Sequence, residues 1–330
     1  MAGEVICEVN HLKKYFVTKK DLLGRPVNTV KACDDVSFTV HKGEVIGIVG
    51  ESGCGKTTLG RALLKLEEPT DGEIIFNGEN ITGYSYRQMR SYRKYMQIIF
   101  QDPYASLNPR YTIFDFVREP LDVFKIGTKE ERNQKVLELL DYISIPRAYA
   151  YRYPHELSGG QRQRIVIARA VILNPSLIVC DEAVSALDVS VRAQVLNLLK
   201  DIQRDMQVSY LFISHDISVI RYLSDRIMVM YLGKVMEEGS KEDVLDHPMH
   251  PYTQVLMSAV PVADVHQKSE RIKLEGDVPS PVNPPAGCRF RTRCPYAQEC
   301  CGEEQLLTDI GGGHKVACCR CGELNLTENN

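Results

Sequence analysis

The sequence predicts an α/β fold with a mainly parallel sheet, and two observations support this prediction. Short apolar runs alternate with stretches of helical periodicity, and repeated strand–helix units of this kind build parallel sheets. One of the strands passes into a helix through a glycine-rich loop, which is a recurring feature of such cores. With 330 residues the chain is long for one domain, so we expect one large domain and an appendage.

The N-terminal part contains candidates for two kinds of sheet. Residues 4–9, 36–40 and 73–78 have strand patterns, the last ending in an Asn-Gly turn, and they predict an antiparallel β subdomain beside the core. Residues 44–49 are an apolar run that predicts a buried strand. Residues 58–66 then predict a helix whose apolar face is made of Leu59, Ala62, Leu63 and Leu66.

The rest of the chain continues this alternation. From about residue 87 to residue 170 the sequence is polar with helical spacing, clearest at 130–140, which predicts an inserted helical subdomain. The wholly apolar residues 177–180 predict a central parallel strand. Further strands are predicted at 209–214 and 226–230. Between the strands at 177–180 and 209–214, one helix face is made of Val191, Val195, Leu198, Leu199 and Ile202.

The glycine-rich loop from Gly50 to Thr58 matches the phosphate-binding motif G-x-x-x-x-G-K-[ST] without a mismatch. Glycines let the backbone turn tightly, so that amide N–H groups point at phosphate oxygens. Lys56 brings a positive charge to the β/γ-phosphates, and the Thr57 hydroxyl can bind Mg²⁺. The loop therefore predicts a P-loop NTPase core. The predicted nucleotide contacts are Gly50, Glu51, Ser52, Gly53, Cys54, Gly55, Lys56, Thr57 and Thr58.

Two acidic residues, Asp181 and Glu182, follow the apolar run at 177–180. An aspartate in this position can hold Mg²⁺ through water, and the adjacent glutamate can orient or activate the attacking water. An apolar run followed by two acids is common in proteins. It becomes informative here because a magnesium–nucleotide site needs such a carboxylate.

Composition narrows the class of protein. The hydrophobic and charged fractions, 44% and 25%, are those of an ordinary globular protein. The net charge of −3 gives no basic field for nucleic acid. No apolar run reaches the roughly 18 residues that span a bilayer. The N-terminus lacks the pattern of a signal peptide, so we expect a cytosolic chain or one that docks to a membrane protein.

At residues 157–161, Leu-Ser-Gly-Gly-Gln, the sequence resembles the ATP-binding-cassette (ABC) ATPases, whose signature this is. Further marks of that family occur in the expected order: Gln101 resembles its Q-loop, residues 185–188 its D-loop and His215 its switch histidine. The resemblance covers roughly residues 4 to 260. It implies that two cassettes pair head to tail, so that each ATP lies between one phosphate loop and the other subunit's signature.

The resemblance also implies the roles of individual residues. Glu182, His215 and Gln101 would be catalytic, with His215 contacting the γ-phosphate. Phe16 would stack on adenine, with Tyr15 as the alternative. Mg²⁺ would be held by Thr57, Gln101 and Asp181. As a helix N-terminus suits the γ-phosphate, the partner's ATP would be contacted by Ser158, Gly159, Gly160 and Gln161.

Seven of the eleven cysteines lie between residues 288 and 321, after a segment at 279–285 whose prolines predict a linker. In a reducing compartment such clustering favours metal over disulfides. Residues 283–297 and 316–318 resemble the C-terminal extension of ATPases that serve oligopeptide and dipeptide importers. That resemblance implies a 4Fe–4S cluster, with zinc as the alternative. The implied ligands are Cys288, Cys294, Cys301 and Cys318, and Cys300, Cys319 and Cys321 could exchange with them.

Three arginines alternate between the first two of these cysteines, at 289, 291 and 293. We expect them to form a solvated face, with contact to the charge of a cluster or to a partner ATPase as alternatives.

Together these observations predict an ABC ATPase domain over residues 1–260, with its helical subdomain at about 87–170, and a cysteine-rich extension over 261–330. The resemblance implies a peptide-importer ATPase at the cytoplasmic face of the bacterial membrane. Its partners would be a second ATPase, two permeases and an extracytoplasmic binding protein. The alternatives are an importer of nickel or another small ligand and a soluble ABC ATPase that acts on nucleic acid.

Overall fold

The structure is a computed structural model that describes residues 3–21, 26–259, 272, 274 and 276–321. The chain divides into two compact units, which are described one at a time. The first unit contains Met1–Ile6, His41–Glu44 and Gly83–Ser214. The second contains Cys7–Val40, Val45–Thr82 and His215–Asn330.

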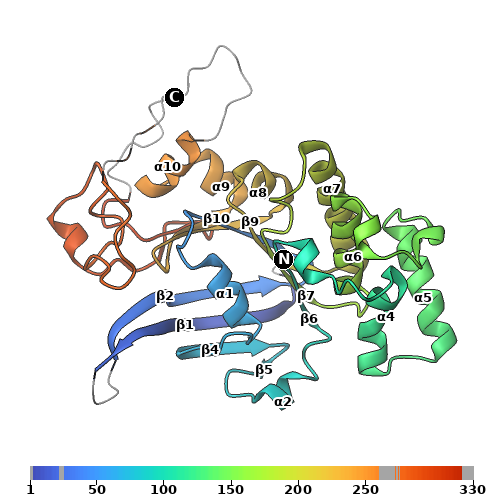
Figure 1. Cartoon of the computed structure of the whole chain (residues 1–330). Coiled ribbons are helices and arrows are strands. Elements are labelled where there is room, and N and C mark those ends of the chain that lie inside the picture. Colours follow the sequence, from blue (N-terminus) through green and yellow to red (C-terminus); the bar gives the residue numbers. More distant parts are fainter. Residues whose placement is uncertain (1–2, 22–25, 260–271, 273, 275, 322–330) are drawn as a thin grey trace, which may run out of the picture. The chain divides into compact units, whose positions relative to one another are not determined.

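The first unit is built on three parallel strands in the order β8, β7, β6, which are Ser209–Ile213, Leu177–Asp181 and Met96–Ile99. Every residue of β7 and β8 is buried, which is why their sequences are continuous apolar runs rather than alternating ones. The prediction of a central parallel strand at 177–180 is therefore confirmed. The helices of this unit are α2 (Tyr86–Met89), α3 (Pro103–Ser106), α4 (Ile113–Phe124), α5 (Lys129–Tyr142), α6 (Gly159–Val171) and α7 (Val189–Met206). In Figure 1, α4 to α7 lie to the right of β6 and β7.

Two of these helices show how the sequence sets their ends. Helix α5 begins where the Thr128 hydroxyl accepts the Glu131 N–H and the Glu131 carboxylate accepts the Thr128 N–H, a reciprocal capping box. This confirms the amphipathic helix expected at 130–140. Helix α7 buries Val195, Leu199 and Ile202, while Val191 and Leu198 of the predicted face are half-buried.

Strand β6 is an element that the sequence analysis missed within the helical subdomain predicted at about 87–170. Its four residues, Met96 to Ile99, pair in parallel with β7, with Met96 opposite Leu177 and Ile99 opposite Cys180. A four-residue strand is too short to show a period of its own, so its polar flanks concealed it.

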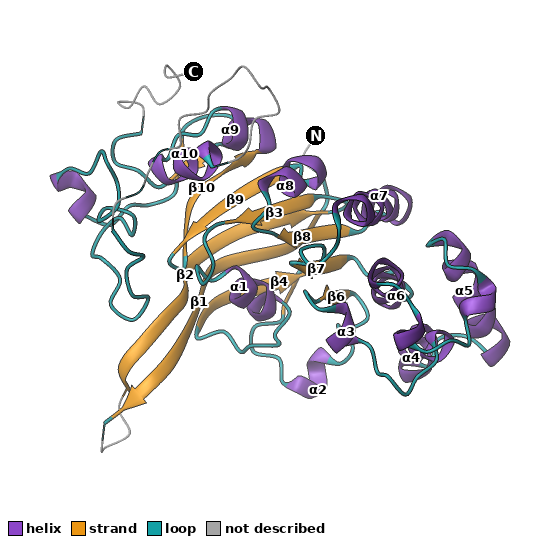
Figure 2. Cartoon of the chain, turned by 45° about the horizontal axis from the view of Figure 1, so that its top comes forward, coloured by secondary structure: helices purple, strands orange, loops and turns teal. Residues whose placement is uncertain are grey.

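The second unit contains two sheets. The antiparallel sheet has the order β2, β1, β4, β5, which are Pro26–His41, Val5–Lys20, Asp71–Phe76 and Glu79–Asn80. This confirms the antiparallel layer, although β1 and β2 are longer than expected. Figure 2 shows them as two long adjacent strands. The other sheet has the order β11, β12, β10, β9, β3, which are Thr308–Asp309, Lys315–Val316, Lys234–Ser240, Arg226–Tyr231 and Val45–Val49.

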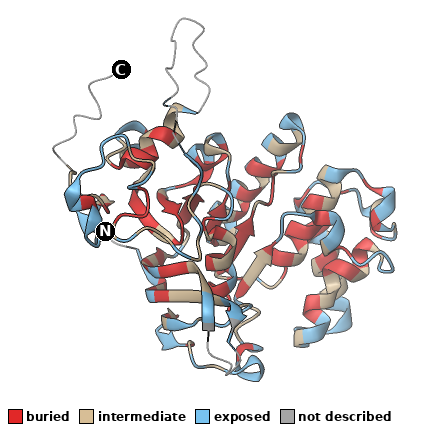
Figure 3. Cartoon of the chain, turned by 60° about the vertical axis from the view of Figure 1, so that its left-hand side comes forward, coloured by how far each residue is buried: buried red, intermediate tan, exposed pale blue. Residues whose placement is uncertain are grey.

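The α-helices in the described part of the second unit are α1 (Lys56–Leu63), α8 (Ile217–Leu223), α9 (Lys241–Asp246) and α10 (Pro251–Ser258). Helix α1 buries Leu59, Ala62 and Leu63 as expected, but it ends at Leu63, and Leu66 is exposed. Leu66 was therefore wrongly assigned to the apolar face. Figure 3 shows that buried residues concentrate in the strands and in the helix faces against them.

The tail of the second unit consists mainly of loops. Residues 279–285 contain no helix or strand, and the Lys31 N–H donates to the Pro281 carbonyl there. Beyond them are a short 3-10 helix, Glu299–Gly302, and the pair β11–β12, which continues the sheet from β10. The boundary expected between 260 and 261 lies outside the described residues.

Candidate functional site

The phosphate loop, residues 50–58, connects the end of β3 to α1 in the second unit, and two of its glycines are required by their surroundings. Gly50 has φ 151°, and a Cβ atom there would lie 2.2 Å from the Met230 carbonyl oxygen. Gly55 has φ 108°, and a Cβ atom there would lie 1.9 Å from the Ala32 carbonyl oxygen. The loop is therefore held in shape by close backbone neighbours on β9 and β2.

Lys56 lies within this loop, with its side chain turned back on it. It is 6% exposed, and its Nζ donates to the Gly50 and Glu51 carbonyl oxygens over 2.8 and 2.9 Å. The N-cap of α1 is Gly55, which has no side chain to cover the first N–H groups of the helix. The ammonium group and the helix N-terminus together form a local anion site.

The side chain of Cys54 in this loop is turned into the protein. The thiol is buried, and burial raises its pKa, so the group is a neutral thiol. Ser52 and Gly53 are exposed, while Thr57 and Thr58 are half-buried.

In the first unit, Asp181 ends β7 and is buried, and Glu182 follows it with φ 51°, a backbone conformation that is uncommon for glutamate. The Glu182 N–H donates to the Ile213 carbonyl oxygen, which fixes the turn against β8. Gln101 donates from Nε2 to the Glu182 carboxylate over 3.0 Å. The structure thus brings Gln101 to the adjacent acids Asp181 and Glu182, which follow it by about 80 residues in the sequence.

The signature residues form the start of α6 in the same unit. The Ser158 hydroxyl accepts the Gln161 N–H, and the Gln161 side chain accepts the Ser158 N–H over 3.0 Å. This capping box holds the first turn in place while Ser158 and Gly159 stay exposed. Gly160 is needed for packing, because a Cβ atom there would lie 2.3 Å from a methyl carbon of Val191 on α7.

The remaining predicted site residues are His215, Phe16 and its alternative Tyr15. His215 is exposed between β8 and α8. Phe16 is half-buried, with the Lys14 ammonium 4.7 Å from its ring centre. The Tyr15 hydroxyl donates to Asp34 in a very short hydrogen bond, so its polar end is engaged in the fold.

The tail contacts the phosphate loop at Glu51. The Glu51 N–H donates to the Tyr252 hydroxyl over 2.8 Å. Its carboxylate accepts two hydrogen bonds from Arg293 Nη1, at 2.9 and 3.1 Å. Tyr252 belongs to α10, and Arg293 lies one residue before Cys294. Glu51 is therefore held by two segments that follow it by about two hundred residues.

A second contact joins the tail to β2 through Arg289 and Asp34. Arg289 donates to the Asp34 carboxylate and, over 3.2 Å, to the Leu232 carbonyl oxygen. Burial alone would raise the pKa of Asp34, but the Tyr15 hydroxyl and the Arg289 guanidinium outweigh it and lower that pKa. Arg289 is 4% exposed and the Arg293 side chain is 10% exposed. The expectation that these arginines form a solvated face is wrong for both.

Aromatic rings fill the space between these contacts. Phe290 is fully buried, with its ring centre 5.3 Å from that of Tyr252 and 5.4 Å from that of Tyr231. The rings of Tyr231 and Tyr252 lie 4.7 Å apart. The tail is thus packed against the cassette core by apolar area as well as by charge.

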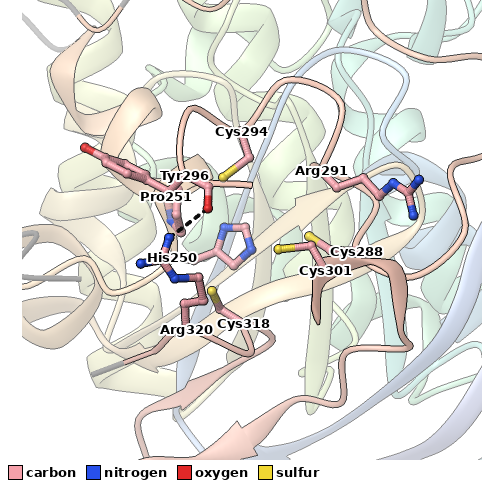
Figure 4. A pocket seen from close by; sticks show the side chains of 9 residues that line it. All are labelled: His250, Pro251, Cys288, Arg291, Cys294, Tyr296, Cys301, Cys318 and Arg320. Atoms are coloured by element: carbon pink, nitrogen blue, oxygen red, sulfur yellow. Dashed lines mark hydrogen bonds between the residues drawn. The ribbon is translucent and has the colours of Figure 1, made fainter. Parts of the chain in front are cut away.

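The four cysteines predicted as ligands line one cavity, which we call the cysteine pocket. It is lined by His250, Pro251, Cys288, Arg291, Cys294, Tyr296, Cys301, Cys318 and Arg320. Figure 4 shows the four cysteine side chains turned toward this space, with the His250 ring among them. The pocket gathers residues from three separate segments of the second unit.

The chemistry of the pocket suits a metal centre bound by thiolates. Burial raises the pKa of Cys288 to about 11 and raises those of Cys294 and Cys318, so the thiols stay neutral until a cation displaces their protons. Four thiolates around Zn²⁺ or around an oxidised 4Fe–4S core leave a net charge of about −2. Arg320 in the pocket wall acts on Cys294 as a positive charge and would balance part of such a charge, whereas the Arg291 guanidinium extends away from the cysteines and donates to the Ala286 carbonyl oxygen (Figure 4).

His250 adds an unpartnered donor to the pocket wall. It is 1% exposed, and its Nδ1 accepts the Tyr252 N–H over 3.0 Å as the N-cap of α10. Its Nε2 has no hydrogen-bond partner among the described residues. Burial lowers the pKa of this histidine to about 3, so the ring is neutral. A buried polar group without a partner costs about 1–3 kcal/mol, which a bound acceptor would offset.

A second group of thiols lies beside the pocket. The sulfur atoms of Cys300, Cys301 and Cys319 lie within 4.8 Å of one another, and those of Cys301 and Cys319 are 3.8 Å apart. Cys301 belongs to both groups. Cys300 and Cys319 are exposed, whereas the pocket cysteines are buried or half-buried.

Sequence reasoning missed several residues of this region. The missed residues are Asp34, Glu237, His250, Tyr252, Arg293 and His314. One signal was available: His250 directly precedes Pro251, and a polar residue before proline is typical of a helix start. Contacts such as that of Arg293 with Glu51 join segments that no local pattern connects.

A phosphate loop after a parallel strand, an acidic pair at the end of another and a capped signature helix define a P-loop ATPase of mixed α/β fold. Comparison with known proteins gives its family. Residues 33–185 match the family model "ABC transporter", and residues 236–301 match "Oligopeptide/dipeptide transporter, C-terminal region". The chain belongs to the ABC transporter ATPases, in the oligopeptide/dipeptide family.

Two curated relatives match almost the whole chain. The oligopeptide transport ATP-binding protein AppF of Bacillus subtilis is 52% identical over 96% of this chain and 97% of its own length. The dipeptide transport ATP-binding protein DppF of Haemophilus influenzae is 49% identical over 93% of this chain and 94% of its own.

Solved structures agree with this fold. The dimeric post-hydrolysis state of the ATP-binding cassette MJ0796, bound to ADP and phosphate, is 28% identical with a TM-score of 0.64. The match covers 72% of this chain and 99% of that one. In the described part of the chain, no helix combines the length and apolarity that a bilayer crossing requires.

Proposed function

We propose that this chain is the ATP-hydrolysing subunit that energises import of dipeptides or oligopeptides. The assignment of the substrate class is based on the match of residues 236–301 to the C-terminal region of oligopeptide/dipeptide transporters. The names of AppF and DppF support it. As an ATPase of the ABC family the chain uses ATP with Mg²⁺.

The contact of Gln101 with Glu182 supports the assignment of the catalytic groups. Glu182 is the general base for the attacking water, and Gln101 positions its carboxylate and senses Mg²⁺. Thr57 and Asp181 complete the magnesium ligands, and His215 contacts the γ-phosphate. Phe16 stacks on adenine, with Tyr15 as the alternative. The phosphate loop, residues 50–58, holds one ATP and the exposed start of α6, residues 158–161, contacts the partner's ATP.

The Glu182→Gln variant tests the base. Removing a general base lowers turnover by about 100-fold or more, while amide and carboxylate have similar shapes, so ATP binding persists. We expect an ATP-bound dimer that is stable during size-exclusion chromatography. Glu242→Gln, which changes an exposed acid of α9, is the matched control. Turnover at the wild-type rate in Glu182→Gln would rule out the base assignment.

Uptake by cells tests the substrate class. Cells that lack the chain should lose uptake of a radiolabelled tripeptide and regain it with the wild-type chain but not with Glu182→Gln. Radioactive nickel is measured in parallel, because a nickel importer is the alternative substrate class. Loss of nickel uptake with peptide uptake intact would replace the peptide proposal.

The proposed assembly follows the family arrangement. The chain pairs with a second, similar ATPase and with two permeases at the cytoplasmic face of a bacterial membrane, and an extracytoplasmic binding protein delivers the peptide. The proposed division is a cassette over residues 1–260, including a helical subdomain at about 87–170, and a C-terminal extension over 261–330. The dimeric state of MJ0796 supports the pairing of cassettes.

We also propose that the cysteine pocket holds a 4Fe–4S cluster through Cys288, Cys294, Cys301 and Cys318, with zinc as the alternative. The four thiols of the pocket are a ligand set suited to either centre, and the Arg320 guanidinium and the unpartnered His250 N–H lie in the wall around them. When bound, the metal centre supplies metal–thiolate bonds that cross-link the loops of the tail.

Metal analysis of protein purified without oxygen tests this centre. A cluster predicts a broad visible absorption band and about four irons and four sulfides per chain, whereas one zinc indicates the alternative. Cys288→Ser should lose the metal and Cys319→Ser should retain most of it. The reverse result would move the site to the group of Cys300, Cys301 and Cys319.

A further inference from the structure

The buried donor of His250 provides an inference about what the pocket binds and how. Because the ring's Nδ1 accepts the Tyr252 N–H, the single proton of the neutral imidazole is carried by Nε2. That Nε2–H lies in the wall of the cysteine pocket and has no partner among the described residues. It is therefore a donor that faces a space in which a ligand would supply the acceptor.

The ring cannot easily turn away from this space. The His250 backbone N–H donates to the Glu237 carboxylate over 2.9 Å, and Glu237 is fully buried. The ring is also packed beside Phe290, with centres 6.1 Å apart. Cap, backbone anchor and ring contact fix the direction of the Nε2–H before any ligand binds, which is preorganisation of a hydrogen bond.

The acceptors that the pocket itself can offer are mainly sulfur atoms. The Tyr296 carbonyl oxygen already accepts from Arg320 Nη1 over 3.0 Å, as the dashed line in Figure 4 marks. Arg291 and Arg320 are donors, and Pro251 has no backbone N–H. A neutral thiol is a weak acceptor, whereas a metal-bound thiolate or a bridging sulfide carries negative charge and is a better one.

We propose that His250 is the positioning residue of the metal centre and donates its Nε2–H to a thiolate or bridging sulfide held by the pocket cysteines. This inference rests on the proposed metal centre. A hydrogen bond to sulfur stabilises the state with more electron density on sulfur, so it favours the reduced cluster and strengthens retention of the metal. His250 also starts α10, so the same residue connects the metal centre to the helix that carries Tyr252.

The test separates the two roles of His250. In His250→Asn the side-chain oxygen can still accept the Tyr252 N–H as an N-cap, but the shorter side chain, whose amide nitrogen is itself a donor, no longer places a donor at the position of Nε2. Phe290→Leu is the matched control, because it changes the ring contact without removing a donor. Both variants are purified without oxygen as full chains, and helix content and unfolding temperature confirm that they fold.

Two readouts apply to the metal-loaded protein. The first is the rate at which a chelator removes the metal, which we expect to rise by about 10-fold or more in His250→Asn, as for other outer-shell partners of metal ligands. The second, for an iron–sulfur centre, is the reduction potential. In His250→Asn we expect the redox equilibrium to move about 10-fold toward the oxidised state. For a one-electron couple this corresponds to a reduction potential about 59 mV lower than that of the wild type. Phe290→Leu should show neither change.

The outcomes distinguish this inference from the proposal on which it rests. Wild-type retention and potential in His250→Asn, in a protein whose wild type binds the metal, overturn the role of His250 and leave the metal centre standing. Equal changes in His250→Asn and Phe290→Leu also overturn it, because packing would then explain them. A wild-type chain that binds neither iron nor zinc overturns the metal centre and the role of His250 together.

Discussion

The phosphate loop and the cysteine pocket are two candidate binding sites of one unit, built in opposite ways. In the loop, the binding groups come from one continuous stretch of backbone, shaped by Gly50 and Gly55 against the carbonyl oxygens of other strands. In the pocket they are side chains from three distant segments. The loop should therefore be intolerant of an added Cβ atom, and the pocket should be sensitive to the loss of single functional groups.

Gly55→Ala should have the largest effect. The left-handed backbone alone costs about 1–2 kcal/mol for alanine, and the Cβ atom would in addition lie 1.9 Å from the Ala32 carbonyl oxygen. We expect ATP binding to weaken by about 100-fold or more, since each 1.4 kcal/mol is about tenfold, measured with a fluorescent nucleotide. Gly53→Ala is the control, because nothing lies within 4 Å of its Cβ position. Equal losses in both variants would show that conformation rather than close packing limits the loop.

Cysteine labelling compares the two sites in one experiment. Cys54 is buried with a raised thiol pKa, whereas Cys300 beside the pocket is exposed. We expect an alkylating reagent to modify Cys300 at least about tenfold faster than Cys54 in the folded chain, measured by mass spectrometry of peptides. The same labelling in denaturant is the reference, because both thiols are then exposed and should react at similar rates. If Cys54 and Cys300 also reacted at similar rates in the folded chain, the buried position of Cys54 would be contradicted.

Arg293→Met should have a moderate effect that passes from the tail to the loop. It replaces the guanidinium by an apolar group on a side chain of similar length, so that the two hydrogen bonds to the Glu51 carboxylate are lost. The pair is partly buried, so we expect about 1 kcal/mol, or a roughly fivefold weaker binding of ATP. Arg221→Met, which removes an exposed pair with Asp246, is the control. Unchanged ATP affinity in Arg293→Met would show that the tail and the loop are energetically independent.

The smallest effect concerns pH. His314 donates to the buried Glu237 over 2.7 Å, and this hydrogen bond raises the pKa of His314 above its ordinary 6.5. A raised pKa in the folded state gives stability that is fully present below 6.5 and is lost as pH rises through the folded-state value. His314→Gln should therefore lower the unfolding free energy by about 1 kcal/mol at about pH 6 and by less at about pH 9. A difference that grows with pH would have the wrong sign.

The same contrast explains what the sequence could predict. The phosphate loop, the buried strand at 177–180 and the capped helix at 159 follow from local spacing, because each is made by neighbours in the chain. The clustering of seven cysteines in the tail is a matter of composition, whereas the choice of Cys288, Cys294, Cys301 and Cys318 among them came from the resemblance to the C-terminal extension of importer ATPases. His250, Arg293 and Glu237 were missed because their roles depend on partners 13 to 242 residues away. The strand at 96–99 was missed because pairing with β7, rather than its own pattern, makes it a strand.

The contacts of Glu51 have a consequence for recombination between related chains. Glu51 contacts at once a hydroxyl from α10 and a guanidinium from the cysteine-rich tail, so these three positions are structurally coupled. In a hybrid whose tail comes from a chain with a different residue at position 51, Glu51 would face a tail that does not match it. We therefore expect an exchanged tail to keep these contacts only when the second residue of the phosphate loop is exchanged with it, and a boundary chosen by domain alone would separate the partners.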